Sequence, residues 1–383
     1  MTAEGLAGGV RQWLVANAAP ADAPSVLAAL REQGTVVGAA QLLDVLAELR
    51  AELRGAGPLQ DLLASGTCTD VLVNGAASLW VDDGCGLRRI VSPFRDEAQV
   101  RRLAQRLAAA AGRRLDDAAP FCDARLLDGT RFHAALSPVA SPGTLVSLRM
   151  PSRERFSADD LVGRGSLPAS ALPWLQALIH ARATFLVSGG TGSGKTTVLQ
   201  CLLGMVSAQE RIVVLEDSAE LNPDHPHVCA LQGRPPNIEG EGEIRLVDLV
   251  RQAMRMRPDR LIIGEVRGPE VVAMLAAFNT GHDGGAGTLH ASSSERVPAR
   301  LEALALAAGL DRPATHAQIA AGLDAVLHVE RVAGVRRVSG LAEVRRDDDG
   351  LTEAVPVLRF EESGVTLLQP RAALLLRLAD HAC

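Results

Sequence analysis

The sequence contains no tyrosine and only one lysine, Lys195; every other residue among its 39 lysines and arginines is arginine. Together with the richness in alanine and arginine, this pattern is typical of codon bias toward G and C. If such drift replaces lysine by arginine wherever the exchange is tolerated, the surviving lysine marks a site that does not tolerate it.

Other absences exclude whole classes of protein. The cysteines are scattered, without a CxxC pair, so neither a disulfide framework nor a zinc site is expected. No uncharged apolar run approaches the roughly 18 residues of a membrane-spanning helix. The first residues, MTAEGLAGGVRQWLV, lack the charged start and long apolar run of a secretory signal. We therefore expect a cytoplasmic protein, which could still dock on a membrane through partners. The six cysteines are Cys68, Cys85, Cys122, Cys201, Cys229 and Cys383.

An excess of positive charge is also missing. The net charge is -6, which argues against binding nucleic acid mainly by bulk positive charge. A local basic channel inside a ring stays open as an alternative. The length of 383 residues and the 47% hydrophobic content favour two or three domains.

The patterning divides the chain into four parts. Residues 1–56 are expected to be helical, since QLLDVLAELRAELR spaces its apolar residues as a helix does. Residues 57–150 mix strand-like and helical runs and predict a smaller α/β domain, and residues 151–165 are expected to be a polar linker. Over residues 166–383, continuous apolar strands alternate with helices. This alternation predicts a mostly parallel sheet covered on both faces, followed by an antiparallel hairpin and a C-terminal helix.

The stretch SGGTGSGKTT fits the pattern GxxxxGK[ST], with a strand before it and a helix after it. Its glycines let successive backbone amides converge on phosphate oxygens, and the helix N-terminus adds partial positive charge. A compact ammonium fits such a nest better than the planar fork of arginine, which explains the single lysine. We expect Lys195 to reach the β- and γ-phosphates of ATP and the Thr196 hydroxyl to bind Mg²⁺. The predicted nucleotide-binding residues are Gly189, Gly190, Thr191, Gly192, Ser193, Gly194, Lys195, Thr196 and Thr197.

Two acidic positions follow apolar strands. In RLIIGEVRG the strand ends at Glu265, where a carboxylate can orient an attacking water as a general base. In VVLEDSAEL, Glu216 and Asp217 can bind Mg²⁺ through water or hold the nucleophile. Helix capping by Asp217 is the open alternative for the second position. Thr196, Glu216 and Glu265 are thus the candidate metal residues.

Two histidines, His282 and His290, flank a glycine-rich strand in NTGHDGGAGTLHASS. A histidine in such a place can hydrogen-bond a γ-phosphate or pass its presence to a neighbouring subunit. Spacing alone does not distinguish these roles from an ordinary structural one.

These motifs, in this order, resemble the type II/IV secretion ATPase superfamily, over about residues 57–328. The resemblance is carried by IVVLEDSAEL, RPPNIEGEGE, DLVRQAMRMRPDRLIIGEVRG and NTGHDGGAGTLHASSSERVPARLE, and by PLQDLLASGTCTDVLVNG nearer the start. The branch that looks most similar is that of the Tad-pilus assembly ATPases, which are related to conjugal-transfer ATPases. The four-cysteine zinc element of some type II secretion ATPases is absent, which also favours this branch.

The resemblance implies a homo-hexameric ring of RecA-like P-loop ATPase domains, each preceded by an N-terminal α/β domain. The ring would lie at the inner face of the cytoplasmic membrane and work with inner-membrane platform proteins of a pilus or secretion complex. It also implies that Glu265 belongs to the Walker B motif, Glu216 to an acidic box, and His282 and His290 to a histidine box. Arginines of the N-terminal domain would reach the nucleotide, with Arg149 and Arg131 as the candidates.

The sequence therefore predicts an Mg²⁺-dependent ATPase that drives pilus assembly or secretion, in which Lys195, Glu265, Glu216, His290, Arg149 and Arg131 are the candidate catalytic residues. A conjugation-type DNA-transfer ATPase or nucleic-acid translocase with the same core is the first alternative, although the acidic balance argues against nucleic acid as a direct partner. A regulator that binds ATP without turnover is the second.

Overall fold

The structure is a computed structural model, and the chain in it divides into two compact units, Met1–Ser152 and Arg153–Cys383. The second unit holds the glycine-rich loop. The structure describes residues 3–17, 19, 22–35, 37–38, 41–43, 45–46, 56–65, 68–84, 86–150, 155–236, 240–281, 283–332 and 334–381.

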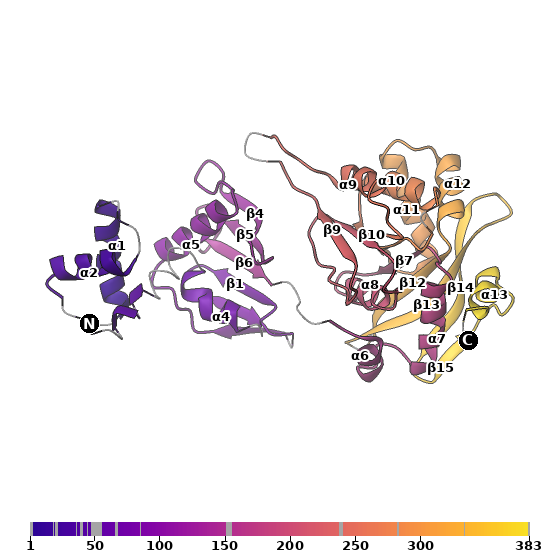
Figure 1. The fold of residues 1–383 in the computed structure, drawn as a ribbon, viewed down its shortest axis with the longest axis horizontal. Coiled ribbons are helices and arrows are strands. Elements are labelled where there is room, and N and C mark those ends of the chain that lie inside the picture. Colours follow the sequence, from indigo (N-terminus) through magenta and orange to yellow (C-terminus); the bar gives the residue numbers. More distant parts are fainter. Residues whose placement is uncertain are drawn as a thin grey trace. The chain divides into compact units, whose positions relative to one another are not determined.

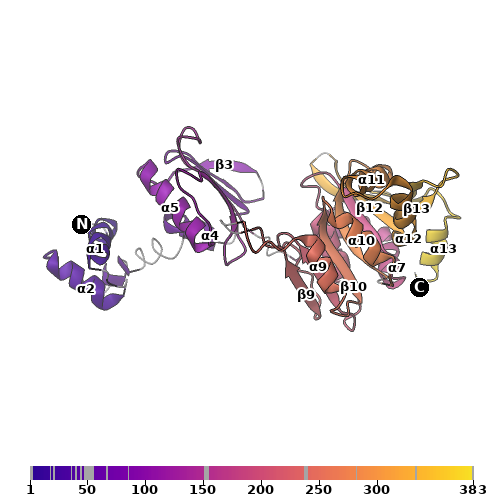
Figure 2. The ribbon, with the colours of Figure 1, turned by 90° about the horizontal axis from the view of Figure 1, so that it is seen from above.

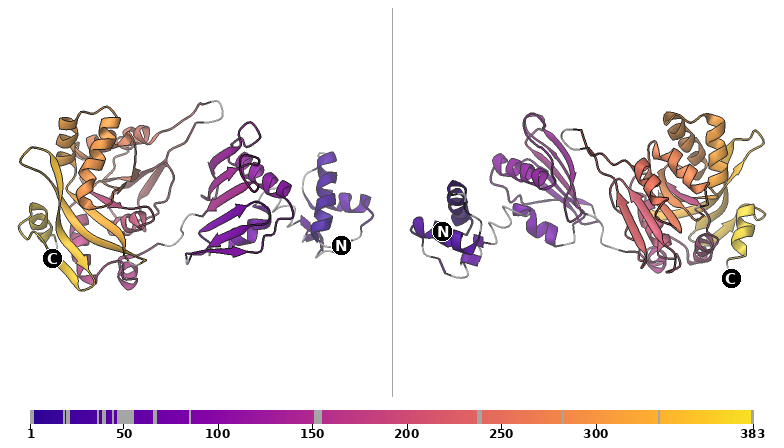
Figure 3. Two further views of the ribbon diagram at one scale, coloured as in Figure 1. Left: turned by 180° about the vertical axis from the view of Figure 1, so that it is seen from behind. Right: turned by 45° about the horizontal axis from the view of Figure 1, so that its top comes forward.

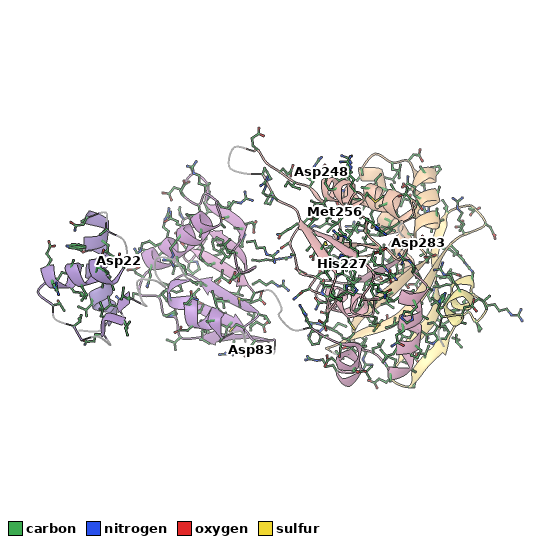
Figure 4. All side chains as sticks on the ribbon, viewed as in Figure 1. Asp22, Asp83, His227, Asp248, Met256 and Asp283 are labelled. Carbon is green, nitrogen blue, oxygen red and sulfur yellow. The ribbon has the colours of Figure 1, made fainter. Side chains whose placement is uncertain are left out.

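The chain begins with two helices, α1 (Ala3–Ala16) and α2 (Ala23–Glu32). Asp22, labelled in Figure 4, caps α2 by accepting a hydrogen bond from the Ser25 amide at 3.0 Å. The two helices share an apolar cluster, which Val45 and Leu46 complete. The described part of this segment is largely helical, and much of the helix expected after residue 41 lies outside the described residues. The cluster contains Leu6, Val10, Leu14, Val26, Ala29, Leu30, Val45 and Leu46.

The rest of the first unit is a six-stranded antiparallel sheet in the order β3-β2-β1-β6-β5-β4. Alternate strand residues point to one face, where the helix α5 covers them (Figure 1). Strands β3 and β4 were not singled out from the sequence. The strands are β1 (Asp70–Asn74), β2 (Leu79–Asp82), β3 (Leu87–Ile90), β4 (Phe121–Arg125), β5 (Arg131–Ala135) and β6 (Leu145–Arg149), and the helices are α4 (Gln60–Ala64) and α5 (Glu97–Ala110).

The second unit is built on a nine-stranded sheet in the order β15-β14-β13-β12-β7-β11-β10-β8-β9. Strands β12, β7, β11, β10, β8 and β9 pair in parallel, as the sequence pattern predicts. The expected late hairpin is present, and its antiparallel strands continue the same sheet beyond β12. The strands are β7 (Phe185–Gly189), β8 (Ile212–Glu216), β9 (Val228–Gln232), β10 (Arg260–Val266), β11 (Ala286–His290), β12 (Ala325–Val332), β13 (Val335–Arg346), β14 (Thr352–Glu361) and β15 (Gly364–Leu367).

Helices cover both faces of this sheet, as Figures 2 and 3 show. Helices α7, α8 and α13 share one apolar cluster with alternate strand residues such as Phe185 and Val187. Helices α9, α10, α11 and α12 share the other cluster with the intervening residues, such as Leu186. Each central strand is therefore buried on both sides, which is why its sequence is an unbroken apolar run. The helices are α7 (Leu172–His180), α8 (Lys195–Leu203), α9 (Leu246–Ala253), α10 (Glu270–Phe278), α11 (Val297–Ala307), α12 (Arg312–Gly322) and α13 (Ala373–Ala379).

The segment expected to be a linker, 151–165, differs from that expectation in its second half. Residues Ala158–Gly163 form the helix α6, which opens with a capping box between Ser157 and Asp160. Leu161 is buried in the core of the second unit, and Phe156 packs against the same cluster. The polar composition hid these two apolar anchors, which attach the segment to the second unit.

The described cysteines Cys68, Cys122, Cys201 and Cys229 are free thiols. Burial raises the pKa of the Cys201 thiol to about 11.

Over the described ranges, no group of three His, Cys, Asp or Glu side chains is placed so that it could hold a metal ion. None of the helices found there is both long and apolar enough to cross a membrane.

A buried arginine holds the amino end of β10. Arg260, only 2% exposed, donates to both carboxylate oxygens of Glu210 at 2.8 and 3.1 Å and to the Ile179 carbonyl at 2.9 Å. Arg182 pairs with the same carboxylate at 2.7 Å. A Cβ on Gly284 would lie 2.1 Å from an Arg260 nitrogen, so this position requires glycine. The cluster ties β10 and α7 together at the edge of the sheet away from the glycine-rich loop.

Glu210→Ala should lower the free energy of unfolding of the second unit by about 3 kcal/mol, because it leaves the buried Arg260 cation without this carboxylate. Asp224→Ala is the control, since it removes an exposed pair with Arg155 and should cost less than about 1 kcal/mol.

Urea unfolding followed by tryptophan fluorescence measures this, because Trp174 lies in α7 of the second unit. Replacing Trp13 and Trp80 by phenylalanine removes the two tryptophans of the first unit. An equal decrease in the free energy of unfolding for the Glu210 and Asp224 variants would contradict the structural role given to the buried pair.

Candidate nucleotide site

The candidate residues of the second unit meet at one edge of its sheet. Since β7, β8, β10 and β11 are parallel, their carboxyl ends lie on the same side. Gly189 at the end of β7 is level with His290 on β11 and with Val329 on β12. Glu216 ends β8, and Glu265 is the last residue but one of β10. The glycine-rich loop follows β7 directly and leads into α8.

The loop requires glycine at particular positions. A Cβ on Gly189 would lie 2.2 Å from the Val329 carbonyl oxygen and 2.6 Å from Ser193 Oγ, so no larger residue fits. Gly192 and Gly194 have φ values of 69° and 101°, in the left-handed region that favours glycine. The glycines therefore let the loop turn tightly against β12 and enter α8.

Lys195 lies inside this turn and is only 7% exposed. Its Nζ donates to the Gly190 carbonyl at 2.8 Å and lies 3.3 Å from His290 Nδ1. Burial lowers the pKa of Lys195, and the nearby carboxylates of Glu265 and Glu220 act in the opposite direction. The ammonium is thus held at the loop between the Gly190 carbonyl and the His290 ring.

His290 connects this lysine to Glu265. Its Nε2 lies 2.7 Å from Glu265 Oε1, while Nδ1 faces Lys195. The imidazole thus lies between the Lys195 ammonium and the Glu265 carboxylate. The sequence placed these three residues near phosphate, and the structure brings them into one line of polar contacts.

Arg267 is a site residue that the sequence analysis did not single out. It donates to Asp217 Oδ2 at 2.8 Å and lies 3.7 Å from Glu265 Oε2. The hydrogen bond to Asp217 is the main reason why its pKa is raised. The available signal was its position two residues after the strand-end glutamate. Arg267 and His290 together fix the Glu265 carboxylate from two sides.

Glu216 is turned toward its own loop. It is 4% exposed and accepts hydrogen bonds from the Glu220 amide at 2.9 Å and the Leu221 amide at 3.1 Å. A Cβ on Gly264 would lie 2.5 Å from Glu216 Cγ, so this side chain packs directly on β10. This geometry favours a role in shaping the segment after β8, and the metal role expected for Glu216 stays a prediction.

The loop has the donors that a phosphate requires. Ser193 is buried, and its Oγ has no hydrogen-bond partner among the described residues. No side chain caps the N-terminus of α8, which begins at Lys195, so its first amides are available. Thr196 follows in the first turn and is half-buried. The residues present therefore fit a triphosphate with Mg²⁺, whose other ligands would be phosphate and water oxygens.

The two arginines proposed to reach the nucleotide lie in the first unit. Arg131 on β5 and Arg149 on β6 are Cα partners in neighbouring strands, so both side chains are on the same face of the sheet. Both are exposed, and Arg149 Nε lies 3.9 Å from Asp70 Oδ1. This face is the one that α5 leaves uncovered. Their role in nucleotide binding stays a prediction, and the remaining candidate, His282, lies outside the described residues.

Residues 52–345 match the family described as type II/IV secretion system protein. The chain belongs to this family. A Mycobacterium tuberculosis protein whose name assigns it to conjugal transfer is 51% identical over 331 residues, covering 84% of this chain and 93% of the relative. The type IV secretion system protein PtlH of Bordetella pertussis is 31% identical over 294 residues, covering 69% of this chain and 86% of PtlH.

Solved structures share the fold. The ATPase DotB of Legionella pneumophila aligns with a TM-score of 0.50 at 18% identity, over 79% of this chain and 80% of DotB. The pilus retraction motor PilT, solved with bound ADP, aligns with a TM-score of 0.50 at 18% identity, over 84% of this chain and 85% of PilT. The resemblance inferred from the motifs is thus confirmed at the level of the superfamily, and the chain has the two-domain α/β fold of these proteins. Its assignment to the Tad branch stays a prediction.

The lowered pKa of Lys195 has a consequence for stability. The unfolded chain binds this proton more tightly than the folded chain does, so the charged lysine destabilises the fold at neutral pH. This loss of folding stability disappears only as the pH rises above the ordinary pKa of lysine. Lys195→Met should therefore raise the melting temperature of the nucleotide-free protein at pH 7. The difference in melting temperature between the variant and the wild type should become smaller in alkaline solution.

Thermal unfolding of both proteins between pH 7 and high pH checks this. Arg346→Met, at an exposed position on β13, is the control and should leave the melting temperature unchanged. A lower melting temperature for Lys195→Met would show that the bonds to Gly190 and His290 outweigh the cost of burial.

Proposed function

We propose that this protein is an ATPase whose RecA-like second unit hydrolyses ATP to drive a pilus or secretion machine. The observation that carries the proposal is the line from Lys195 through His290 to Glu265 at the mouth of the glycine-rich loop. A phosphate cradle at one end of this line and a carboxylate at the other are the two parts that phosphoryl transfer to water requires.

Each residue has a distinct task in this proposal. The amides of the loop and the Lys195 ammonium bind the phosphates and neutralise their charge. Glu265 orients the attacking water and accepts its proton, while His290 and Arg267 hold that carboxylate in place. Thr196 would hold Mg²⁺, which supplies additional positive charge on the phosphate oxygens. Glu216 supports the site by fixing the segment that carries Asp217.

We further propose a homo-hexamer that works at the cytoplasmic face of the membrane with inner-membrane platform proteins of the Tad type. Family membership supports this assembly, and the exposed arginines Arg131 and Arg149 supply charges suited to a nucleotide-bound subunit. The cycle would switch the protein between two conformational states, as a motor requires.

A conjugation-type role in DNA transfer is the second candidate. It is favoured by the relative that is 51% identical and is named for conjugal transfer. Stimulation of ATP hydrolysis by single- or double-stranded DNA would support it. The net charge of -6 favours a protein cargo instead.

Glu265→Gln should reduce ATP hydrolysis by at least roughly 100-fold while ATP still binds, because the amide cannot accept the proton of the water. Phosphate release measures turnover, and titration with a fluorescent ATP analogue measures binding. Glu361→Gln, an exposed glutamate at the end of β14, is the matched control and should hydrolyse ATP normally. If the wild-type protein binds ATP with Mg²⁺ as a hexamer and shows no turnover, the protein is a nucleotide-binding regulator and the motor proposal is wrong.

The proposed hexamer should appear in light scattering coupled to gel filtration as a species of about six times 40.2 kDa when nucleotide and Mg²⁺ are present. The Lys195→Ala variant should not respond to nucleotide in this measurement. A wild-type protein that stays monomeric at concentrations at which it hydrolyses ATP would contradict the ring.

A further inference from the structure

A second cation lies against the phosphate loop within the same unit. Strand β12 runs beside β7 up to the pair Val329 and Gly189, and then continues to Val332 beyond the end of β7. Strand β13 returns from Val335, so the end of the β12–β13 hairpin projects past β7 on the side where the glycine-rich loop lies. Strands β12 and β13 are labelled in Figure 1. A residue of this hairpin can therefore contact the loop without help from another subunit.

Arg336 lies beside the loop at Gly194. A Cβ built on Gly194 would lie 3.4 Å from Arg336 Cδ and 3.9 Å from Arg336 Cβ, which are ordinary van der Waals distances. Val338, two residues further along β13, packs in the apolar cluster that contains Val198 of α8. Because residues i and i+2 of a strand face the same side, Arg336 faces the N-terminal end of α8. Its aliphatic stem passes beside Gly194, the residue that precedes Lys195.

The charge of this hairpin is not balanced within the described part of the chain. Arg336 is directly opposite Arg331 across the hairpin, and like charges in this position repel. Arg331 donates to the Gly334 carbonyl at 3.0 Å, and neither arginine pairs with a described carboxylate. The neighbouring Arg337, in contrast, is paired with Glu362. An anion held at the loop would relieve the repulsion between Arg331 and Arg336.

We propose that Arg336 binds the phosphates of the nucleotide in cis, as a cationic cap on the glycine-rich loop, with Arg331 reinforcing its charge. The guanidinium is carried by a stem that passes beside Gly194, and it would present several donors to oxygen atoms that the loop amides leave exposed. The assignment rests on the proposed nucleotide site. It makes Arg336 a determinant of nucleotide affinity that is independent of the arginines of the first unit.

The test measures the affinity of the full-length protein for ADP with Mg²⁺, because ADP binds without turnover. Arg336→Ala should weaken binding about 10-fold, the effect of losing one hydrogen-bonded charge. Arg336→Lys should recover part of this loss, since it keeps the charge but not the planar fork. The wild-type affinity should also fall more steeply with added salt than the affinity of Arg336→Ala.

Arg346→Ala is the matched control. Arg346 is exposed on the same strand, ten residues away or roughly 30 Å along it. The Arg346→Ala protein should therefore bind ADP with the wild-type affinity. The melting temperature of Arg336→Ala without nucleotide should not fall below that of the wild type, because the variant loses the repulsion with Arg331; a lower value would indicate a structural role instead of a binding role.

The outcomes distinguish the two proposals. If the wild type binds ADP, Lys195→Ala does not, and Arg336→Ala binds within about twofold of the wild type, the cis cap is wrong and the ATPase proposal stands. If Arg336→Lys binds no better than Arg336→Ala and the salt dependence is unchanged, the charge has no role and the cap is again overturned. If the wild type itself binds neither ADP nor ATP, both proposals fall.

Discussion

The parallel register of β7 between β11 and β12 is the constraint on which the candidate site depends. It places Gly189 level with His290 on one side and with Val329 on the other. The Val329 carbonyl approaches the position that a Cβ of residue 189 would take, which leaves no alternative to glycine there. The position of His290, which lies between Lys195 and the Glu265 carboxylate, is set by the same pairing. A shift of one residue would turn His290 to the opposite face and break the line from Lys195 to Glu265.

Much of this site could be predicted from the sequence because its parts are local. The glycine-rich loop with its flanking strand and helix is a continuous motif, and Glu265 and Glu216 stand at the ends of apolar strands. The order of those strands depends on pairings between distant segments, so the contact between His290 and Glu265 could not be derived from spacing. Arg267 and Arg336 were missed for another reason: in a chain whose basic residues are almost all arginine, composition does not single out any one of them.

The main elements of the fold could also be predicted, whereas some short elements could not. Alternating apolar strands and helices indicate the second unit, and the strand–turn–strand pattern around Asn74 indicates the first. Short polar strands such as β3 and β4 were not recognised, since their side chains are largely exposed and lack an apolar pattern. Helix α6 was missed within residues 151–165 because this segment is mostly polar. Its two apolar residues that pack into the core are outnumbered by charged neighbours. Glu216 shows the same limit, since only the structure reveals that its carboxylate bonds to the amides of its own loop.

The presence of a single lysine also determines how the folded protein reacts with reagents that modify primary amines. Apart from an α-amino group, the Lys195 side chain is the one primary amine in the sequence, and it is almost enclosed by its loop. Acylating reagents, amine-directed cross-linkers and enzymes that acetylate or conjugate lysine therefore find no accessible side-chain target on the native surface. Modification at this residue would report that the loop has opened, and each modified molecule would have lost the positive charge inside its glycine-rich loop.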